Sequence, residues 1–209
     1  EYKKINKFTS PTRVTLPTLA EIGGDFSDRA TTTIRYPGTT TPIPNKDLSS
    51  LMTPDGKAVM AVYAAMIKKA AVYTNAPTTN NATFQVLNPF RWRQDIAKID
   101  WRPNDKDYFY GRWIHDSYDL VDPYGTFNSS SLPNTPTARN RPGYGPQFAY
   151  NHTFGPTLIN EAKINASWNG QRTPMQGTDW QRESFGFQFP RIFGGNGLYS
   201  NGIPDVSIN

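Results

Sequence analysis

The chain has 209 residues, of which 36% are hydrophobic and 19% are charged, and it carries a formal net charge of +5. Both fractions lie below those of compact soluble domains, whereas the aromatic residues reach 13% and Cys is absent, which excludes a disulfide scaffold and a thiolate metal site. Many aromatics together with abundant Gly, Pro, Thr and Asn are typical of strands joined by long polar loops, so we expect an all-β fold.

Residues 1–90 are predicted to be a long loop region with one helix. Repeated prolines break any long helix or strand before residue 50. Thr53 can cap a helix and Pro54 suits its first position, so a short helix is expected over about 54–73. No apolar run approaches the roughly 18 residues of a membrane-spanning helix. The polar, Lys-rich start does not resemble a signal peptide, so we expect an interior piece or a mature product of a longer chain.

Residues 91–169 are predicted to form two antiparallel β-hairpins, because apolar and polar side chains alternate along four runs. In the first hairpin, strands over residues 91–101 and 107–115 are joined by a turn at 103–106. In the second, strands over residues 147–154 and 158–168 are joined by a turn at 155–157. Alternation places Phe109 and Trp113 on one face of the first hairpin, and Tyr108, Tyr110 and Arg112 on the other.

Very short and very long connections alternate along the chain. A polar loop over residues 116–145 is expected to join the hairpins, and residues 170–209 are expected to form a Gly-rich loop region. Outer-membrane barrels have this asymmetry, with short periplasmic turns and long extracellular loops. The pattern therefore predicts antiparallel hairpins of a partial outer-membrane barrel.

Aromatic residues near the strand ends suit the interfacial girdles of such a barrel. The candidates are Trp92, Trp101, Phe154 and Trp168. Trp92 and Trp101 have opposite parity on one strand, so without a bulge only one of them can face lipid.

Four stretches follow one another along the chain: LPTLAEIGGDFS at 16–27, GKAVMAVY at 56–63, the charged hairpin pattern over 93–107, and HTFGPTLINE at 152–161. In this order they resemble segments of TonB-dependent outer-membrane receptors with a carboxypeptidase-regulatory-like N-terminal domain, the Oar-like receptors. Gly155 stands where the family has Ser, and the segment 34–37 fits only loosely.

The resemblance implies a section of a receptor barrel in the bacterial outer membrane, contributing membrane strands and ligand-facing loops. The implied partners are the remaining barrel and plug, TonB through that plug alone, and outer-membrane lipid. Four strands leave two open edges. The alternative is therefore a self-assembling or interaction β-protein derived from such a receptor. A fibre subunit and a glycan- or peptide-binding module are examples. Such a protein would pair with copies of itself through those edges.

No motif for catalysis or for a cofactor is present, so we expect neither an enzyme nor a cofactor-binding protein. Aromatics in or near polar loops suit stacking on sugars or peptides, although they can equally pin the loops together. These candidate ligand-binding residues are Tyr108, Tyr110, Tyr118, Tyr124, Tyr144 and Trp180.

Two further kinds of site are disfavoured. His115, Asp119 and Asp122 are weak candidates for a cation site, and we expect no metal. Aromatics interleave with arginines at residues 90–93, as on surfaces that bind single-stranded nucleic acid, but no basic stripe continues from them. We therefore expect no nucleic-acid partner.

Overall fold

A computed structural model describes residues 1–127, 130–191 and 201–204 of the chain. These residues form two compact units. The first, here the sheet unit, contains residues 1–8, 87–122 and 137–174. The second, here the loop unit, lies within residues 9–86, 123–136 and 175–209. The Gly-rich stretch predicted after residue 170 lies partly outside the described residues, at 192–200 and 205–209.

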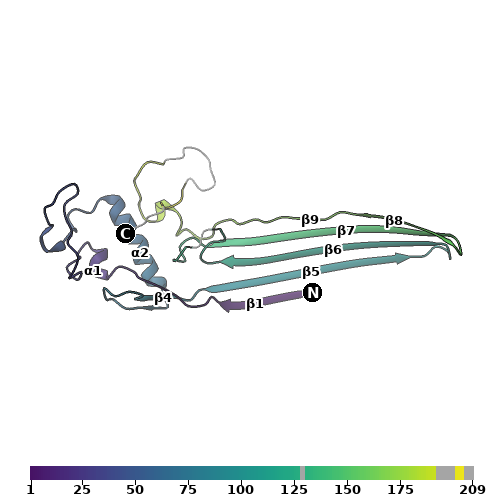
Figure 1. Cartoon of the computed structure of the whole chain (residues 1–209), viewed down its shortest axis with the longest axis horizontal. Helices are drawn as coiled ribbons and strands as arrows, with labels where there is room; N and C mark the ends of the chain where they lie inside the picture. Colours follow the sequence, from purple (N-terminus) through teal and green to yellow (C-terminus); the bar gives the residue numbers. More distant parts are fainter. Residues whose placement is uncertain (128–129, 192–200, 205–209) are drawn as a thin grey trace. The chain divides into compact units, whose positions relative to one another are not determined.

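The sheet unit is one antiparallel sheet with the strand order β1-β5-β6-β7-β8, in which β9 also pairs with β7 (Figure 1). Its strands are β1 (Tyr2–Phe8), β5 (Leu87–Trp101), β6 (Asp107–Asp122), β7 (Thr137–Gly155), β8 (Leu158–Asn165) and β9 (Trp168–Asn169). The predicted fold class is confirmed: antiparallel hairpins of outer-membrane barrel type, with long loops and a helix.

Strands β5, β6 and β7 are longer than their sequence pattern predicts, whereas β8 ends at Asn165, before the predicted Trp168. The loop expected over 116–145 is shorter, because β6 continues to Asp122 and β7 begins at Thr137. β1 was not expected at all, because residues 1–50 were predicted to be irregular. These added strand segments carry polar side chains on both faces, so they lack the alternation by which a half-buried strand is recognised.

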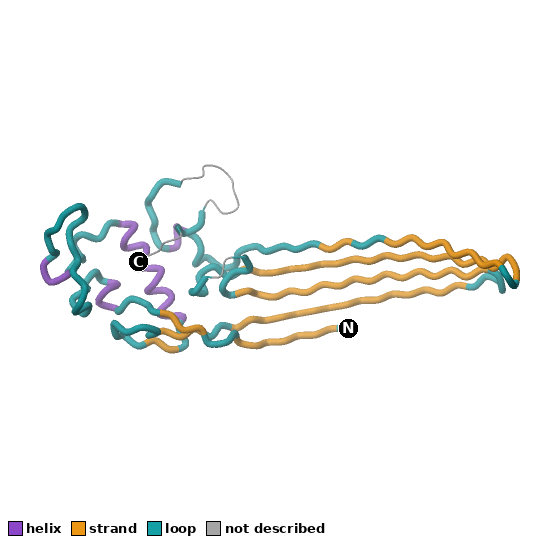
Figure 2. Tube along the Cα trace, viewed as in Figure 1, coloured by secondary structure: helices purple, strands orange, loops and turns teal. Residues whose placement is uncertain are grey.

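Short turns connect the strands at one end of the sheet and long segments connect them at the other (Figure 2). In the first turn, the side-chain oxygen of Asn104 accepts hydrogen bonds from the backbone N–H groups of Lys106 and Asp107, at 2.8 and 2.9 Å. At the second turn, the register of β7 against β8 shifts between Thr153 and Gly155. All three loop-unit segments therefore leave from the end opposite the turns.

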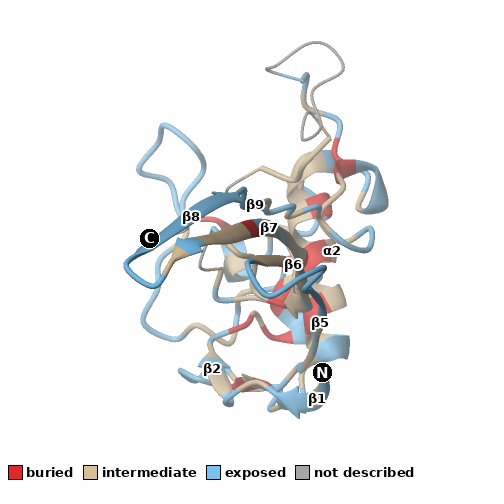
Figure 3. Ribbon diagram, turned by 90° about the vertical axis from the view of Figure 1, so that its right-hand side faces the viewer, coloured by how far each residue is buried: buried red, intermediate tan, exposed pale blue. Residues whose placement is uncertain are grey.

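The loop unit is organised around helix α2 (Pro54–Lys69), and its buried residues gather there (Figure 3). Thr53 caps the helix as predicted, accepting a hydrogen bond from the N–H of Gly56 at 3.0 Å. Met66 packs with Leu16, Ala82 and Phe84 in one core. The helix ends before the predicted residue 73, because Ala70 has an extended backbone and the next residues form strand β3 (Val72–Tyr73).

Shorter elements complete the loop unit. A small sheet has the order β2-β4-β3. The other bounds are β2 (Thr12–Val14), β4 (Ala82–Phe84), α1 (Leu19–Ile22) and the 3₁₀ turns η1 (Pro44–Lys46) and η2 (Arg182–Ser184). α1 begins with a capping box in which Thr18 and Glu21 satisfy each other's backbone N–H groups. These elements correct the expectation of irregular structure before residue 50. Among the described residues, no helix combines the length and apolar character needed to cross a membrane.

Candidate functional site

One face of the sheet is apolar, and the strand register defines it. Ile99 lies opposite Gly111, Gly111 opposite Phe148, and Phe148 opposite Ile164, so these residues form one row across β5, β6, β7 and β8. Ile99 and Ile164 are 73% and 70% exposed in the isolated chain. This is too much apolar surface to face water, so lipid or another apolar partner must cover it. We call the side bearing this row the apolar face and the opposite side the polar face.

Stacked aromatic residues border the apolar face toward the short turns. The ring centroids of Trp101 and Phe109 are 5.1 Å apart, and those of Phe109 and Tyr150 are 4.6 Å apart. His152 and Phe154 follow at 4.4 Å in an edge-to-face pair. The cluster forms a first belt of the kind found at membrane interfaces.

A second aromatic belt crosses the same face farther from the turns. Tyr144 lies between Trp113 and Trp168, with ring centroids 5.8 and 5.6 Å away. Beyond this belt the face turns polar, with an ion pair of Arg93 and Asp95 at 2.8 Å. Amphipathic rings at both borders of an apolar band are the arrangement that places a strand across a bilayer.

The height of the apolar band fits an outer membrane. Along β6 it is bounded by Asp107 and His115, which at about 3.4 Å per residue lie about 27 Å apart along the strand. With a strand tilt of about 40°, the band is about 20 Å tall, close to the roughly 25 Å of outer-membrane barrels. The strands β5, β6 and β7 therefore continue well beyond the bilayer on the side of the long connections.

The polar face carries charges and tyrosines that satisfy one another. The ammonium group of Lys98 lies 3.0 Å from Asp100 and 5.0 Å from the ring centre of Tyr110. The hydroxyl of Tyr108 donates a hydrogen bond to Asp100, and Arg102 lies over the Tyr108 ring at 4.9 Å. Lys163 and Glu161 form a similar ion pair on β8 at 3.0 Å. Such a self-neutralising set of charges suits the wet interior of a barrel.

Trp92 belongs to the polar face, which corrects its assignment as a girdle residue. It lies opposite Tyr118 and Lys3, and its indole N–H donates a hydrogen bond to Asp116 at 2.5 Å. No bulge interrupts β5 between Trp92 and Trp101, so the two side chains lie on opposite faces, as their sequence spacing predicts. Of the four girdle candidates, Trp101, Phe154 and Trp168 lie on the apolar face.

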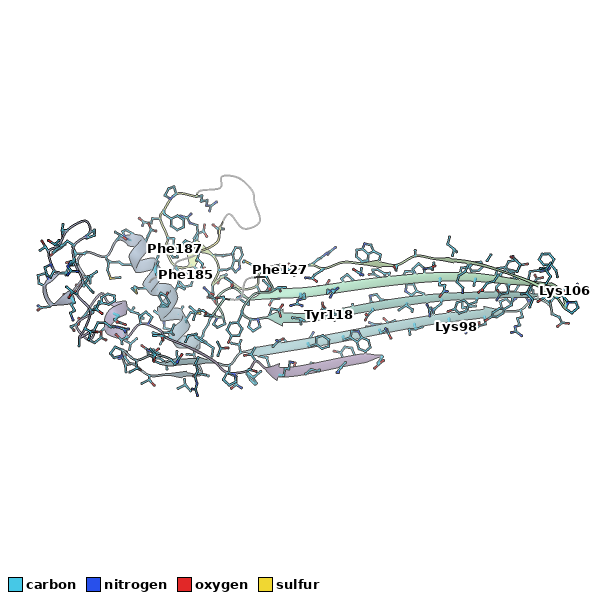
Figure 4. All side chains as sticks on the ribbon, viewed as in Figure 1. Lys98, Lys106, Tyr118, Phe127, Phe185 and Phe187 are labelled. Atoms are coloured by element: carbon cyan, nitrogen blue, oxygen red, sulfur yellow. The ribbon has the colours of Figure 1, made fainter. Side chains whose placement is uncertain are left out.

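The six predicted ligand-binding residues do not form one site. Tyr108, Tyr110 and Tyr118 lie on the polar face, and Figure 4 labels Tyr118 and Lys98 at different positions along the strands. Tyr144 lies on the apolar face in the second belt. The remaining two residues belong to the loop unit: Tyr124 packs against the core containing Met66, and the indole N–H of Trp180 donates to the carbonyl of Gly177.

The weak metal candidates are also separated by the sheet. His115 and Asp119 share the apolar-face side of β6, and the Nδ1 atom of His115 lies 3.3 Å from Asp95. Asp122 has the opposite parity and accepts a hydrogen bond from the Nε of Arg139 at 3.0 Å. Within the described ranges, no group of three His, Cys, Asp or Glu side chains is placed to hold a metal ion.

The loop unit contains a buried ion pair that the sequence did not single out. Glu21 is 2% exposed and is paired with Arg29. Burial alone would raise the pKa of Glu21, but hydrogen bonds from the Arg29 guanidinium and from the Thr18 backbone outweigh it and hold the pKa below its ordinary value. A Thr three residues before a Glu is the signal that could have identified it.

An antiparallel sheet with an apolar band between two aromatic belts, short turns and a polar inner face defines a section of an outer-membrane β-barrel. The family model described as "Outer membrane beta barrel domain" matches residues 1–209, so the chain belongs to that family and is located in the outer membrane. No curated protein and no solved structure shows a significant match to it.

Proposed function

We propose that the chain is a section of the barrel of a TonB-dependent outer-membrane receptor of the Oar-like type. The observation that carries the proposal is the occurrence of four family-like stretches in the family's order. The stretch at 16–27 contributes Leu16 to the core of the loop unit and builds α1 with its capping box. The stretch at 152–161 forms the turn from β7 to β8.

The polar face supports a transport function, because a substrate would cross the membrane through a solvated barrel interior. In transporters of this class a plug fills the lumen of a barrel of about 22 strands. The chain would supply β1, β5, β6, β7 and β8 to such a barrel, while the loop unit would form its extracellular surface. We propose a binding and transport role without a catalytic step.

A pull-down with TonB tests the proposal. The full-length protein, extracted from outer membranes, is incubated with the periplasmic C-terminal domain of TonB, and we expect a stable complex. Deletion of the TonB-contacting segment of the plug should abolish it. The proposal fails if the full reading frame encodes no plug, or if the intact protein does not retain TonB.

The open edge of β8 favours the second candidate, a self-assembling surface protein. In the described part of the chain β8 pairs with β7 alone, and all eight of its residues are exposed. An unpaired edge of this kind recruits another strand. Filaments of the full-length protein in electron micrographs without detergent would favour this alternative, whereas a detergent-dependent monomer would exclude it.

A further inference from the structure

A row of four residues crosses the polar face beyond the second aromatic belt. Lys3 lies opposite Trp92, Trp92 opposite Tyr118, and Tyr118 opposite Arg141, so the row runs over β1, β5, β6 and β7. We call these four residues the aromatic row. Its two inner members are aromatic and its two outer members are cations.

Neighbouring residues fix the rings of the aromatic row. Trp92 is held by its hydrogen bond to Asp116 at 2.5 Å. Phe90, in the next row, lies against Tyr118 with ring centroids 5.8 Å apart. Arg141 donates a hydrogen bond to the hydroxyl of Tyr118 at 2.9 Å, with its guanidinium 5.4 Å from the ring centre. The rings are therefore positioned before a ligand arrives, which lowers the entropy cost of binding.

The two cations at the ends of the row are available to a ligand. Lys3 and Arg141 are exposed, and in the portion of the chain that the structure describes neither forms a salt bridge with a carboxylate. β5 and β6 lie between their strands, so at about 4.8 Å per strand their backbones are about 14 Å apart. Two anionic groups separated by ring-shaped units would match this spacing.

We propose that the aromatic row binds an acidic oligosaccharide, with sugar rings against Trp92 and Tyr118 and carboxylates at Lys3 and Arg141. Aromatic faces provide apolar surface for a sugar ring. Guanidinium groups bind carboxylates through charge-assisted hydrogen bonds. A single-stranded nucleic acid fits less well, because it carries a phosphate at every nucleotide whereas the row has cations at its two ends alone. The inference rests on the proposed function and names its ligand class.

Calorimetric titration of the full-length protein in detergent tests the proposal. The probes are a trimer of galacturonic acid and a neutral trimer of galactose. Lys3→Gln and Arg141→Gln should each weaken binding of the acidic trimer about tenfold, which corresponds to the loss of one charge-assisted contact of about 1.4 kcal/mol. Lys3→Gln should leave binding of the neutral trimer unchanged, and Arg141→Gln should weaken it less than binding of the acidic trimer, because Arg141 also holds the Tyr118 ring. Added salt should weaken binding of the acidic trimer alone.

Arg93→Gln is the matched control, because Arg93 neighbours Trp92 on β5 but faces the other side of the sheet and pairs with Asp95. It should leave both affinities unchanged. The proposal is overturned if the acidic trimer binds no more tightly than the neutral one, if Arg93→Gln weakens binding as much as Arg141→Gln, or if a single-stranded oligonucleotide competes more strongly than either trimer. These titrations contain no TonB, so their failure is distinguishable from failure of the TonB pull-down.

Discussion

Glu21 both caps a helix and carries a buried charge. Its side chain caps α1, accepts hydrogen bonds from Arg29 and is almost inaccessible to water. A carboxylate buried in this way is stable only while its partners remain, because an unpaired buried charge is costly. The pair thus ties the segment around residue 29 to the start of the loop unit.

Acidification should loosen this region. Because the pKa of Glu21 is lowered in the folded unit, its stabilising contribution is complete above the unfolded pKa and is lost as the pH falls through the folded one. Hydrogen exchange at the amides of α1, normalised for intrinsic rates, should be unaffected down to the ordinary pKa of glutamic acid, about 4.3, and should accelerate as the pH falls further. Glu21→Gln keeps the cap but loses the charge, so it should cost about 2 kcal/mol and remove the pH dependence. Parallel pH profiles for the two proteins would contradict this account.

Strand β5 allows the assignment of the apolar and polar faces to be tested within a single element. Ile99 lies in the central row of the apolar face, and Ile96, 60% exposed, has the opposite parity and pairs with Ile114. Ile99→Arg should cost about 2–4 kcal/mol, because it places a cation near the bilayer midplane. Ile96→Arg enters the polar interior and should cost much less. Urea unfolding in liposomes measures both, and equal losses would contradict the assignment of the faces.

The same strand shows what its sequence could and could not predict. Between residues 97 and 101 the alternation of apolar and polar side chains defined both faces correctly, because one face meets lipid. From residue 87 to 90 the sequence Leu-Asn-Pro-Phe does not alternate regularly and contains a proline, which is unusual inside a strand, so the pattern carried no signal. Tyr124 and Trp180 could not be placed either, because their surroundings come from segments distant in sequence.

The whole molecule has two units with separate means of stabilisation. The sheet unit depends on its backbone ladder and a lipid-facing surface, whereas the loop unit has a water-excluding core around Phe84 and Met66. Phe84→Ala should cost about 3–5 kcal/mol, comparable with the stability of a small domain. We therefore expect trypsin to cleave the loop unit of this variant rapidly in outer-membrane vesicles while the barrel keeps its heat-modifiable mobility on gels.

Phe127→Ala is the control for this experiment. Phe127 also belongs to the loop unit but is 76% exposed, whereas Phe84 is 0% exposed. Its removal should leave the cleavage rate unchanged. If Phe84→Ala abolished the heat-modifiable form as well, the two units would not be independently stabilised.

The loop unit is assembled from three separate stretches of chain, between which the strands cross the membrane. Its core contains Leu16 and Met66 from the first stretch, and Tyr124 and Leu132 from the second pack against it. Phe187 of the third stretch packs against the same helix at Ala58 and Val62. A hairpin inserted the wrong way round would leave one stretch on the other side of the bilayer, and the core would stay open to water. The core of the loop unit can therefore form only after every preceding strand has been inserted into the membrane in the correct direction.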